Sequence, residues 1–506
     1  MGIEENMNKS RENNGDEGKP APDISAFNAL QNESIALIKE KTSAFVEEQG
    51  RRPRILVAGV DQKVHVRATQ WFASFFSEMG FDVDISLLQQ TPHGVVKTAV
   101  ENDVDLICVS SPGNVSPNLL PRLSNALKAK NAENILIIVG SETPLKNDLS
   151  LRRAGATGIV NIHRLVIDIE SWLDQIKAGT DVSQDGQYYI KGIIDQDRRI
   201  IAKAITLIES VHPAAHQKTA KEIMDALIPL SGNAIRIGIS GVPGVGKSSF
   251  IESFGMMLAE KGYHVAVLAV DPSSSRSGGS IMGDKTRMER LSVEPNVFIR
   301  PSSTGGALGG VARKTREAMV VCEAAGFGVI IVETVGVGQS EITVSSMVDF
   351  FLVMLIAGAG DEIQGLKRGI IEFADTIAIN KADGDNIEKA REAKMDYQSA
   401  LSILRPPSRV WSPPVLTCSA HTMDGLNTIW EIILDHREKL DVSGELDEKR
   451  RKQALDWMWD LVEEGLIDRF YKHPKVIKLL PKMIDDVKTG KTIASAAFHK
   501  LLSLNE

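Results

Sequence analysis

Several things are scarce in this sequence, and each shortage excludes a class of protein. Only three cysteines, Cys108, Cys322 and Cys418, occur in 506 residues, each within an apolar run. They indicate buried thiols of a reducing compartment and exclude a disulfide scaffold. Lys and Arg number 58 against 66 Asp and Glu, without a basic run, so we expect no nucleic-acid partner. No apolar stretch reaches the ~20 residues of a membrane-spanning helix, and the N-terminus is unlike a signal peptide. We therefore expect no membrane contact and a cytoplasmic location.

What is present is an ordinary globular composition, 43% hydrophobic and 25% charged, in a chain long enough for roughly three or four domains. We expect residues 1–24, which are almost wholly polar, to be disordered. Residues 25–50 have the spacing of an amphipathic helix. The remainder is expected to comprise an α/β domain over 51–178, a polar linker over 179–192, helices over 193–232, a second α/β domain over 233–440 and a helical arm over 441–506.

Residues 51–178 alternate strand-like apolar runs with helix-like segments. The strand-like runs lie at 55–60, 83–87, 106–110, 135–139 and 158–161. Five β/α units of this length predict an open parallel sheet covered on both faces, a flavodoxin-like layout. Ligands of such sheets bind at the carboxyl ends of the strands.

The most informative stretch runs from 235 to 250 and reads I-R-I-G-I-S-G-V-P-G-V-G-K-S-S-F. A β-branched strand leads into Gly-x-x-x-x-Gly-Lys-Ser and then into helix-forming sequence, which is the context of a phosphate-binding loop (P-loop). The glycines let backbone N–H groups surround an anion, and the helix N-terminus adds partial positive charge. Lys247 can reach the β- and γ-phosphates, and the Ser248 hydroxyl can bind Mg²⁺. The predicted nucleotide-binding residues here are Gly241, Val242, Pro243, Gly244, Val245, Gly246, Lys247, Ser248 and Ser249.

Carboxylates follow two later strand-like runs. Asp271 ends one run, Glu333 ends the next, and Asp284 lies between them in the chain. A carboxylate at the carboxyl end of a strand beside the phosphate site can bind the Mg²⁺ shell, and the N–H of Gly336 can reach a γ-phosphate. We therefore expect Lys247, Glu333 and Gly336 to serve in nucleotide hydrolysis.

Two further strand-like runs predict the base that the site selects. Residues 375–379 lead into Asn380-Lys381-Ala382-Asp383, and residues 415–418 lead into Ser419-Ala420. The Asp383 carboxylate can accept hydrogen bonds from N1–H and the exocyclic amine of guanine, a pair that adenine does not offer. A backbone N–H at Ser419-Ala420 can bond to guanine O6. The expected ligand is GTP or GDP, bound here by Asn380, Lys381, Asp383, Ser419 and Ala420.

Taken in order, the motifs V-P-G-V-G-K-S, V-D-P-S-S, G-D-K-T-R-M, E-T-V-G-V-G-Q-S-E and N-K-A-D resemble those of the MeaB/ArgK group of SIMIBI-class GTPases. These are chaperones of adenosylcobalamin-dependent mutases such as methylmalonyl-CoA mutase. The resemblance implies a third switch over 358–367 and a C-terminal arm that joins two copies into a homodimer. The alternative for the arm is packing against its own G domain. By the same resemblance, the residues surrounding Mg²⁺ are Ser248, Asp271, Asp284 and Glu333.

Residues 51–178 resemble the cobalamin-binding domain of adenosylcobalamin-dependent acyl-CoA mutases, in runs such as G-F-D-V-D-I and L-Q-Q-T-P. That family has Asp-x-His-x-x-Gly, whose His ligates cobalt while the Asp holds its other nitrogen. The matching register here is Lys63-Val64-His65-Val66-Arg67-Ala68. The resemblance implies cobalamin at His65, Ser110 and Gly140. Because Lys63 cannot accept the imidazole hydrogen bond, we expect weak cobalamin binding or none, and a docking role. A cofactor carrier is the alternative.

Together these features predict an α/β protein with a flavodoxin-like, cobalamin-binding-like sheet followed by a P-loop GTPase domain with helical extensions. The expected function is a GTPase chaperone that gates cofactor loading or protection of an adenosylcobalamin-dependent acyl-CoA mutase. Val337 stands where Ras-like enzymes have a water-orienting Gln, so slow intrinsic hydrolysis, raised by a partner, is expected. A nickel-type metal inserter stays open, although it would need a Cys/His cluster near the switches, and none is visible. A kinase acting on a transport protein also stays open.

Overall fold

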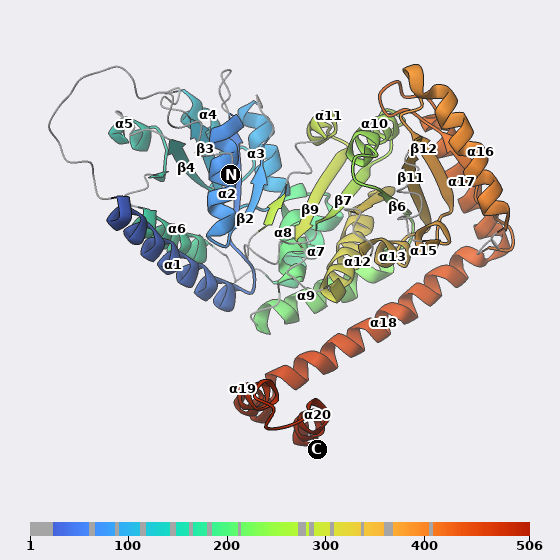
Figure 1. Cartoon of the computed structure of the whole chain (residues 1–506). Coiled ribbons are helices and arrows are strands. Elements are labelled where there is room, and N and C mark those ends of the chain that lie inside the picture. Colours follow the sequence, from blue (N-terminus) through green and yellow to red (C-terminus); the bar gives the residue numbers. More distant parts are fainter. Residues whose placement is uncertain are drawn as a thin grey trace.

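Two parallel β-sheets with helices on their faces form the molecule (Figure 1), which confirms the predicted α/β class. The computed structural model describes residues 24–59, 66–86, 91–111, 118–141, 148–160, 165–179, 185–210, 214–271, 280–282, 288–303, 308–334, 339–358, 368–403 and 408–505. Among these residues no helix combines the length and the apolar character that crossing a bilayer requires.

The first sheet is the predicted flavodoxin-like unit with one added strand. Its order is β5-β4-β3-β1-β2-β8, and every pairing in it is parallel. The strands are β1 (Arg54–Gly59), β2 (Asp82–Ile85), β3 (Leu106–Ser111), β4 (Leu136–Ser141), β5 (Gly158–Val160) and β8 (Ser280–Met282). Strands β1 and β3 are largely apolar and buried, as a sheet covered on both faces requires, whereas β2 alternates buried Asp82 and Asp84 with apolar residues. The edge strand β8 comes from far along the chain and was not predicted.

The helices of this first half begin with α1 (Ile24–Gln49), which packs along α6 (Leu165–Gly179). Two ion pairs, Lys41 with Glu170 and Lys177 with Glu48, both at 2.5 Å, join these helices. The others are α2 (Val66–Glu78), α3 (Pro92–Glu101), α4 (Leu119–Lys128) and α5 (Asp148–Arg153).

The second sheet has seven parallel strands in the order β13-β12-β11-β6-β10-β7-β9. The strands are β6 (Ile235–Gly241), β7 (Val265–Asp271), β9 (Val297–Ser303), β10 (Val329–Thr334), β11 (Phe350–Ile356), β12 (Thr376–Asn380) and β13 (Val415–Thr417). Apolar clusters fill both faces of this sheet. Because β6 lies between β10 and β11, the loop after β6 opens at the centre of the sheet's carboxyl edge, where ligands of such sheets bind.

The segment expected to be a linker, residues 179–192, includes most of a helix among its described residues. Helix α6 ends at Gly179, and α7 spans Gly186–Ile194, with Asp185 accepting a hydrogen bond from the N–H of Tyr188. Tyr189 and Ile193 of α7 are buried in the core of the second half. A polar N-cap and an apolar face therefore make this stretch part of the second half of the molecule. Helices α8 (Arg198–Glu209) and α9 (Ala214–Leu227) follow it.

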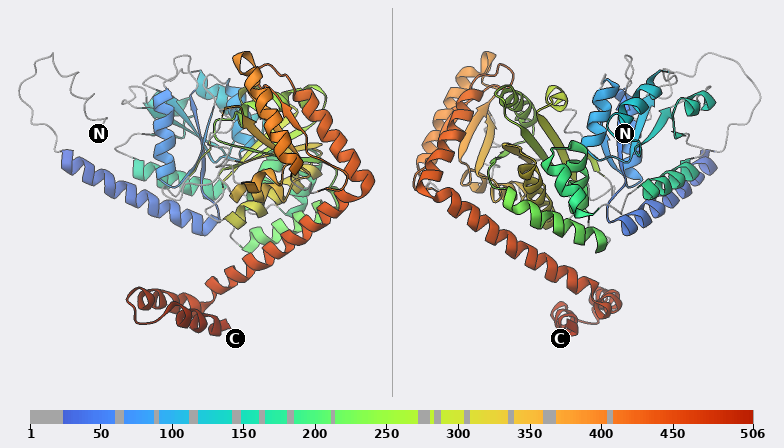
Figure 2. Two further views of the ribbon diagram at one scale, coloured as in Figure 1. Left: turned by 45° about the vertical axis from the view of Figure 1, so that its right-hand side comes forward. Right: turned by 180° about the vertical axis from the view of Figure 1, so that it is seen from behind.

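The remaining helices cover the second sheet and form a projecting arm. Those on the sheet are α10 (Lys247–Glu260), α11 (Glu289–Val293), α12 (Leu308–Ala324), α13 (Gln339–Ser345), α15 (Arg368–Ile371), α16 (Ile387–Ile403) and α17 (Leu426–Ser443). Helix α18 (Glu445–Lys472) runs away from the sheet and carries α19 (Pro474–Lys488) and α20 (Ala494–Leu502) at its far end, as both views in Figure 2 show.

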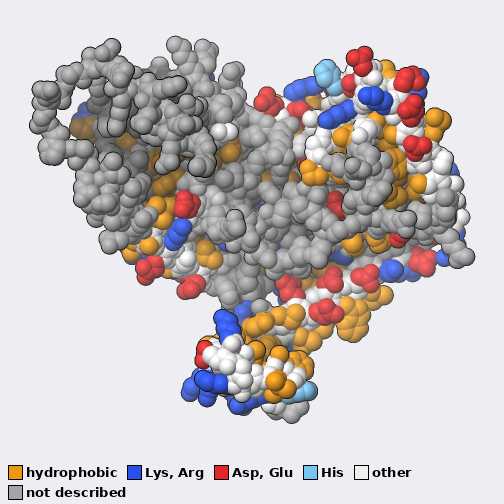
Figure 3. All heavy atoms as spheres, viewed as in Figure 1, with side chains coloured by type: hydrophobic (Ala, Val, Ile, Leu, Met, Phe, Trp, Pro, Cys, Tyr) orange, Lys and Arg blue, Asp and Glu red, His pale blue; other side chains and the backbone are white. Residues whose placement is uncertain are grey.

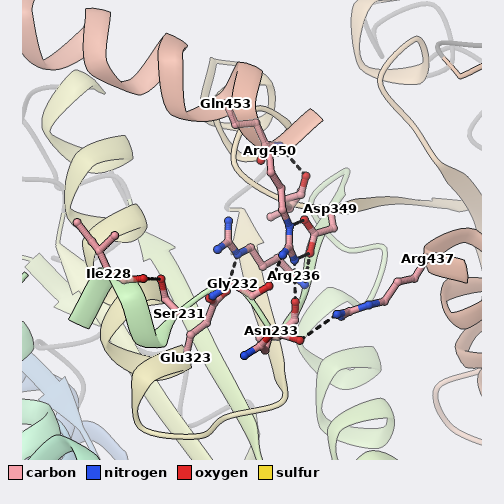
Figure 4. A network of polar contacts seen from close by, with 12 residues as sticks. Ile228, Ser231, Gly232, Asn233, Arg236, Glu323, Asp349, Arg437, Arg450 and Gln453 are labelled. Atoms are coloured by element: carbon pink, nitrogen blue, oxygen red, sulfur yellow. Dashed lines mark hydrogen bonds and ion pairs between the residues drawn. The ribbon is translucent and has the colours of Figure 1, made fainter. Parts of the chain in front are cut away.

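The root of this arm is held by a polar network at the amino ends of the central strands (Figure 4). Arg450 donates to both carboxylate oxygens of Asp349, at 2.9 and 2.7 Å, and to the carbonyls of Gly232 and Ala234. Gln453 donates to the carbonyl of Val348 at 2.9 Å. The arm therefore begins on the side of the sheet opposite to the loop after β6.

Candidate nucleotide site

The predicted phosphate-binding loop joins the end of β6 to the start of α10. Gly244 and Gly246 have φ of 81° and 94°, a left-handed conformation that favours glycine. A Cβ on Gly246 would lie 2.9 Å from Nδ2 of Asn380, and one on Gly241 would lie 2.4 Å from the carbonyl oxygen of Met354. Each glycine is thus required by conformation or by close packing, and helix α10 presents its N-terminus to the loop.

Lys247 is the first residue of α10, and its ammonium group lies over the loop. Its Nζ donates to the carbonyl oxygen of Gly241 at 2.6 Å and to that of Val242 at 3.5 Å, and the residue is 9% exposed. The loop therefore holds the cation close to the backbone N–H groups that would surround a phosphate. Ser249, in the same first turn, is exposed.

A hydroxyl and a carboxylate meet beside the loop. Ser248 Oγ donates to Glu333 Oε1 at 3.1 Å, and Glu333 is 6% exposed near the end of β10. Both are hard oxygen ligands of the kind that Mg²⁺ prefers, so this pair fits the predicted metal site. Among the described residues no group of three or more His, Cys, Asp or Glu could hold a metal ion.

Several predicted site residues lie outside the described part of the chain. Asp271 ends β7 and pairs in register with Ser303 of β9, but its side chain is not described. Asp284, Gly336 and His65 lie outside the described residues altogether. Their predicted roles in binding Mg²⁺, γ-phosphate and cobalt therefore stay predictions.

The residues predicted to bind guanine converge on the same loop. Asn380 donates to the carbonyl of Val245 at 2.8 Å and accepts from the N–H of Ala420 at 3.2 Å, so it ties the base loop to the phosphate loop. Lys381, with φ of 59°, donates from Nζ to the carbonyl of Gly244 at 2.8 Å. Burial raises the pKa of the Cys418 thiol to about 12, so it stays protonated beside Asn380 Oδ1.

Asp383 is oriented by the other base-binding segment. Its carboxylate accepts a hydrogen bond from the Ser419 hydroxyl, and Ser419 in turn accepts one from the N–H of Thr422 at 3.1 Å. Ser419 is fully buried, whereas Asp383 is half-buried. A fixed, partly accessible carboxylate three residues beyond the end of β12 suits the guanine recognition predicted for it.

One contact at the start of the predicted phosphate loop was missed by the sequence reasoning. Glu341, in α13, is 3% exposed and accepts a hydrogen bond from Ser240 Oγ at 3.0 Å, directly before Gly241. It joins the helix after the predicted switch glycine to the start of the phosphate loop. The signal was present because Glu341 ends the motif E-T-V-G-V-G-Q-S-E, in which it had been given no role.

In the first sheet the structure brings Ser110 and Gly140 together as register partners near the carboxyl ends of β3 and β4. The Ser110 hydroxyl lies 2.8 Å from Thr69 Oγ1. A Cβ on Gly140 would lie 2.7 Å from the ring of Phe72, which is 1% exposed. Packing of the chain's own side chains thus accounts for the hydroxyl and for the glycine.

Comparison with known proteins gives two family matches. Residues 201–475 match the family described as methylmalonyl Co-A mutase-associated GTPase MeaB, and residues 53–161 match the B12 binding domain. GTPase ArgK of Escherichia coli is 48% identical over 56% of this chain and 85% of its own length. The mouse protein named methylmalonic aciduria type A homolog, mitochondrial, is 44% identical over 62% of this chain and 77% of its own length.

A GTPase of Caulobacter vibrioides is 55% identical over 62% of this chain and 95% of its own length. A crystal structure described as LAO/AO transport system kinase is 37% identical, with a TM-score of 0.50, and covers 63% of this chain and 97% of that chain. The MeaB match alone spans more than half of the sequence. The chain is therefore a GTPase with a B12-binding-like domain before it, and it belongs to the family of methylmalonyl Co-A mutase-associated GTPases, MeaB.

Proposed function

We propose that this protein is a G-protein chaperone that gates the loading or protection of the cofactor of an adenosylcobalamin-dependent acyl-CoA mutase. The observation that carries the proposal is the presence, in one chain, of a mutase-associated GTPase match over 201–475 and a B12-binding-like sheet over 53–161. The first half resembles a part of the client enzyme and the second half supplies a nucleotide timer. A chaperone that acts on a cobalamin mutase needs a domain that contacts the mutase and a domain that binds and hydrolyses the nucleotide.

In this proposal the chain's residues bind GTP and order its phosphates. The loop N–H groups and Lys247 hold the β- and γ-phosphates, and Asp383 selects guanine. Mg²⁺, held by Ser248, Glu333 and the carboxylates of Asp271 and Asp284, would neutralise phosphate charge during hydrolysis. Since Val337 cannot orient a water, hydrolysis by the chain alone is slow, and the client enzyme raises it.

The first half serves mainly as a docking domain. Three observations on its candidate corrin site favour docking over transport: Lys63 replaces the orienting acid, Thr69 already engages Ser110, and Phe72 already fills the space beside Gly140. Titration of the full chain with adenosylcobalamin should show weak binding or none. Tight binding with a His-ligated spectrum that disappears in His65→Ala would instead identify a cofactor carrier.

The arm is proposed to join two copies of the chain. Along α18, Trp459 and Leu466 are 59% and 61% exposed, and helices α18, α19 and α20 line an apolar groove of about 950 Å³. Figure 3 shows hydrophobic side chains gathered on the arm. Sedimentation should give a dimer that Trp459→Asp with Leu466→Asp converts to a folded monomer. A monomer at micromolar concentration in the unmodified protein would contradict this.

The test of the proposed function is binding to a purified methylmalonyl-CoA mutase. Calorimetry should detect a complex whose affinity differs at least about fivefold between the GDP state and a state with a non-hydrolysable GTP analogue. Lys247→Ala, which loses the phosphate ligand, is expected to abolish that difference. The proposal fails if no complex forms in either nucleotide state while nucleotide binding itself is intact.

A further inference from the structure

The strand β8 comes from the GTPase half but belongs to the other sheet. Residues 280–282 pair in parallel register with 82–84 of β2, so that Ile281 is the partner of Val83. Strand β8 also lies beside β9, the edge strand of the GTPase sheet. It is the short yellow-green arrow beside β2 in Figure 1. The GTPase half thus completes the sheet of the docking domain.

The surroundings of β8 are fixed by buried charges. Arg300 of β9 is fully buried and donates to Thr206 Oγ1 at 2.9 Å and to Glu209 at 3.2 Å, and Glu209 also binds Arg54 of β1 at 3.0 Å. A charge cluster of this kind is costly to break once formed. This cluster therefore holds the two halves together beside β8. Strand β8 can pair with β2 or separate from it without a large movement of one half against the other.

The chain after β8 is also anchored to the first half, through α11. Lys97 of α3 donates to the carbonyl of Ser292 in α11 at 2.5 Å and pairs with Glu101 at 3.1 Å, and Arg198 of α8 pairs with Glu101 at 3.0 Å. Between the end of β7 at Asp271 and this anchor, β8 is the described segment that contacts the first sheet. A three-residue edge strand has few ladder hydrogen bonds, so its pairing with β2 is held by less free energy than that of a longer strand.

The position of β8 in the chain connects it to the nucleotide. Asp271 directly ends the strand before it, and Asp284 stands two residues beyond Met282. Two residues span at most ~7 Å, so a carboxylate drawn to Mg²⁺ at Asp284 constrains where β8 can lie. This step rests on the proposed function, in which Asp271 and Asp284 approach Mg²⁺.

We propose that pairing of β8 with β2 depends on the bound nucleotide, so that the edge of the docking domain reports the state of the GTPase site. The coupling is reciprocal, because any nucleotide that stabilises the pairing is itself bound more tightly when β2 is available. In this proposal β8 responds to the nucleotide, and the surface that it binds is the first sheet of the same chain. The mutase would meet a docking domain whose edge differs between the GTP and GDP states.

Hydrogen exchange on the full, unmodified chain tests this directly. The N–H of Asp82 donates to the carbonyl of Pro53 on the β1 side, so in the strand alternation the N–H and C=O of Val83 face β8, and Met282 supplies the amide from β8. The amides of Val83 and Met282 are compared without nucleotide, with Mg²⁺–GDP and with Mg²⁺ and a non-hydrolysable GTP analogue. The expected result is an exchange rate at Val83 that differs at least about fivefold between two of these states. Strand β5 (Gly158–Val160), the opposite three-residue edge of the same sheet, is the internal control and should not change.

Two results would overturn the proposal in distinguishable ways. Equal exchange at Val83 in all states, with calorimetry proving that nucleotide is bound, removes the coupling and leaves the proposed function standing. Absence of any GTP or GDP binding removes the proposed function together with the coupling that rests on it.

A matched pair of variants supplies an independent reading. Met282→Pro removes the backbone donor that β8 directs at Val83 of β2, and it disfavours a strand there. It should change the ratio of GTP to GDP affinity at least about fivefold. Ile159→Pro makes the same change in β5 and should leave the ratio unaltered, whatever its cost to stability. Equal ratios in Met282→Pro and the unmodified chain, or equal changes in both variants, would contradict the coupling.

Discussion

Ser248 Oγ lies 3.1 Å from Glu333 Oε1, although 85 residues separate them in the chain. The contact forms because β6 and β10 are neighbouring parallel strands, so the first turn after one strand faces the end of the other. An aliphatic hydroxyl and a buried carboxylate in contact offer the oxygen ligands that Mg²⁺ takes in nucleotide sites.

Replacing this carboxylate should weaken the binding of the Mg²⁺ that hydrolysis requires. Glu333→Gln keeps the shape but removes the charge, so the Mg²⁺ concentration for half-maximal GTP hydrolysis is expected to rise on the order of tenfold. Chelation of Mg²⁺ should stop hydrolysis in the unmodified protein. Glu260→Gln, at the exposed end of α10, is the control and should behave like the unmodified chain. An unchanged Mg²⁺ titration in Glu333→Gln would remove Glu333 from the metal site.

Lys247→Ala should reduce GTP hydrolysis on the order of a hundredfold or more, because it deletes the cation aimed at the developing phosphate charge. The helix should persist, since Ala is the best helix former. Hydrolysis rates and circular dichroism of the variant, read beside those of Lys261→Ala at the far end of the same helix, separate chemistry from folding. Normal turnover by folded Lys247→Ala protein would contradict the assignment.

Asp383→Asn should change the preferred base from guanine to xanthine. The amide cannot accept both guanine hydrogens, so GTP affinity is expected to fall roughly a hundredfold while xanthosine triphosphate gains, because each hydrogen bond to a charged group is worth about 1.5–3 kcal/mol. Calorimetry with both nucleotides checks this, with Asp385→Asn as the exposed neighbouring control. If the unmodified protein binds ATP as tightly as GTP, Asp383 does not select the base.

The root of the arm should make stability depend on pH. Burial alone would raise the pKa of Asp349, but the hydrogen bonds and charge of Arg450, with help from Arg236, lower it below its usual value. The unfolded chain, with a carboxyl pKa of about 3.9, then binds more protons than the folded chain below that pH. The stabilisation is complete above pH ~4 and is lost as the pH falls through the folded pKa.

Asp349→Asn should remove part of that acid sensitivity and lower the free energy of unfolding at neutral pH by about 3 kcal/mol, because it leaves Arg450 without its charged partner. Urea unfolding between pH 2.5 and 7 measures both effects. Asp435→Asn, an exposed carboxylate on α17, is the control. Equal pH profiles for Asp349→Asn and the unmodified chain would exclude Asp349 as a source of the acid sensitivity.

The sequence was sufficient to predict those parts of the fold and of the site in which a local residue pattern and the chemistry of its residues indicate the same structure. The glycine loop, the following helix and the residues at 380–383 were predicted because each stands directly at a strand end, and a parallel sheet brings such ends to one edge. Five of the six strands of the first sheet were predicted within a few residues, chiefly because a strand buried on both faces is a nearly continuous apolar run.

Most of what was missed depends on partners distant in the chain, although β11 was missed as well despite its continuous apolar run F-F-L-V-M-L-I. Strand β8 is three residues long and pairs across about 200 positions, so no local period marks it. Strand β9 was missed because Arg300 and Pro301 interrupt its apolar run, and the arginine is tolerated only because Glu209 lies beside it. The contacts of Glu341 with Ser240 and of Arg450 with Asp349 likewise exist only in the folded chain.

The decisive measurement is GTP turnover by the full chain with and without purified apo methylmalonyl-CoA mutase, together with the adenosylcobalamin then bound to the mutase. A chaperone that gates cofactor loading predicts slow hydrolysis alone and at least about tenfold faster hydrolysis with the mutase. It also predicts cofactor loading that differs between GTP and a non-hydrolysable analogue. Turnover unchanged by the mutase, with cofactor loading identical in GTP, GDP and the analogue, would contradict the proposal.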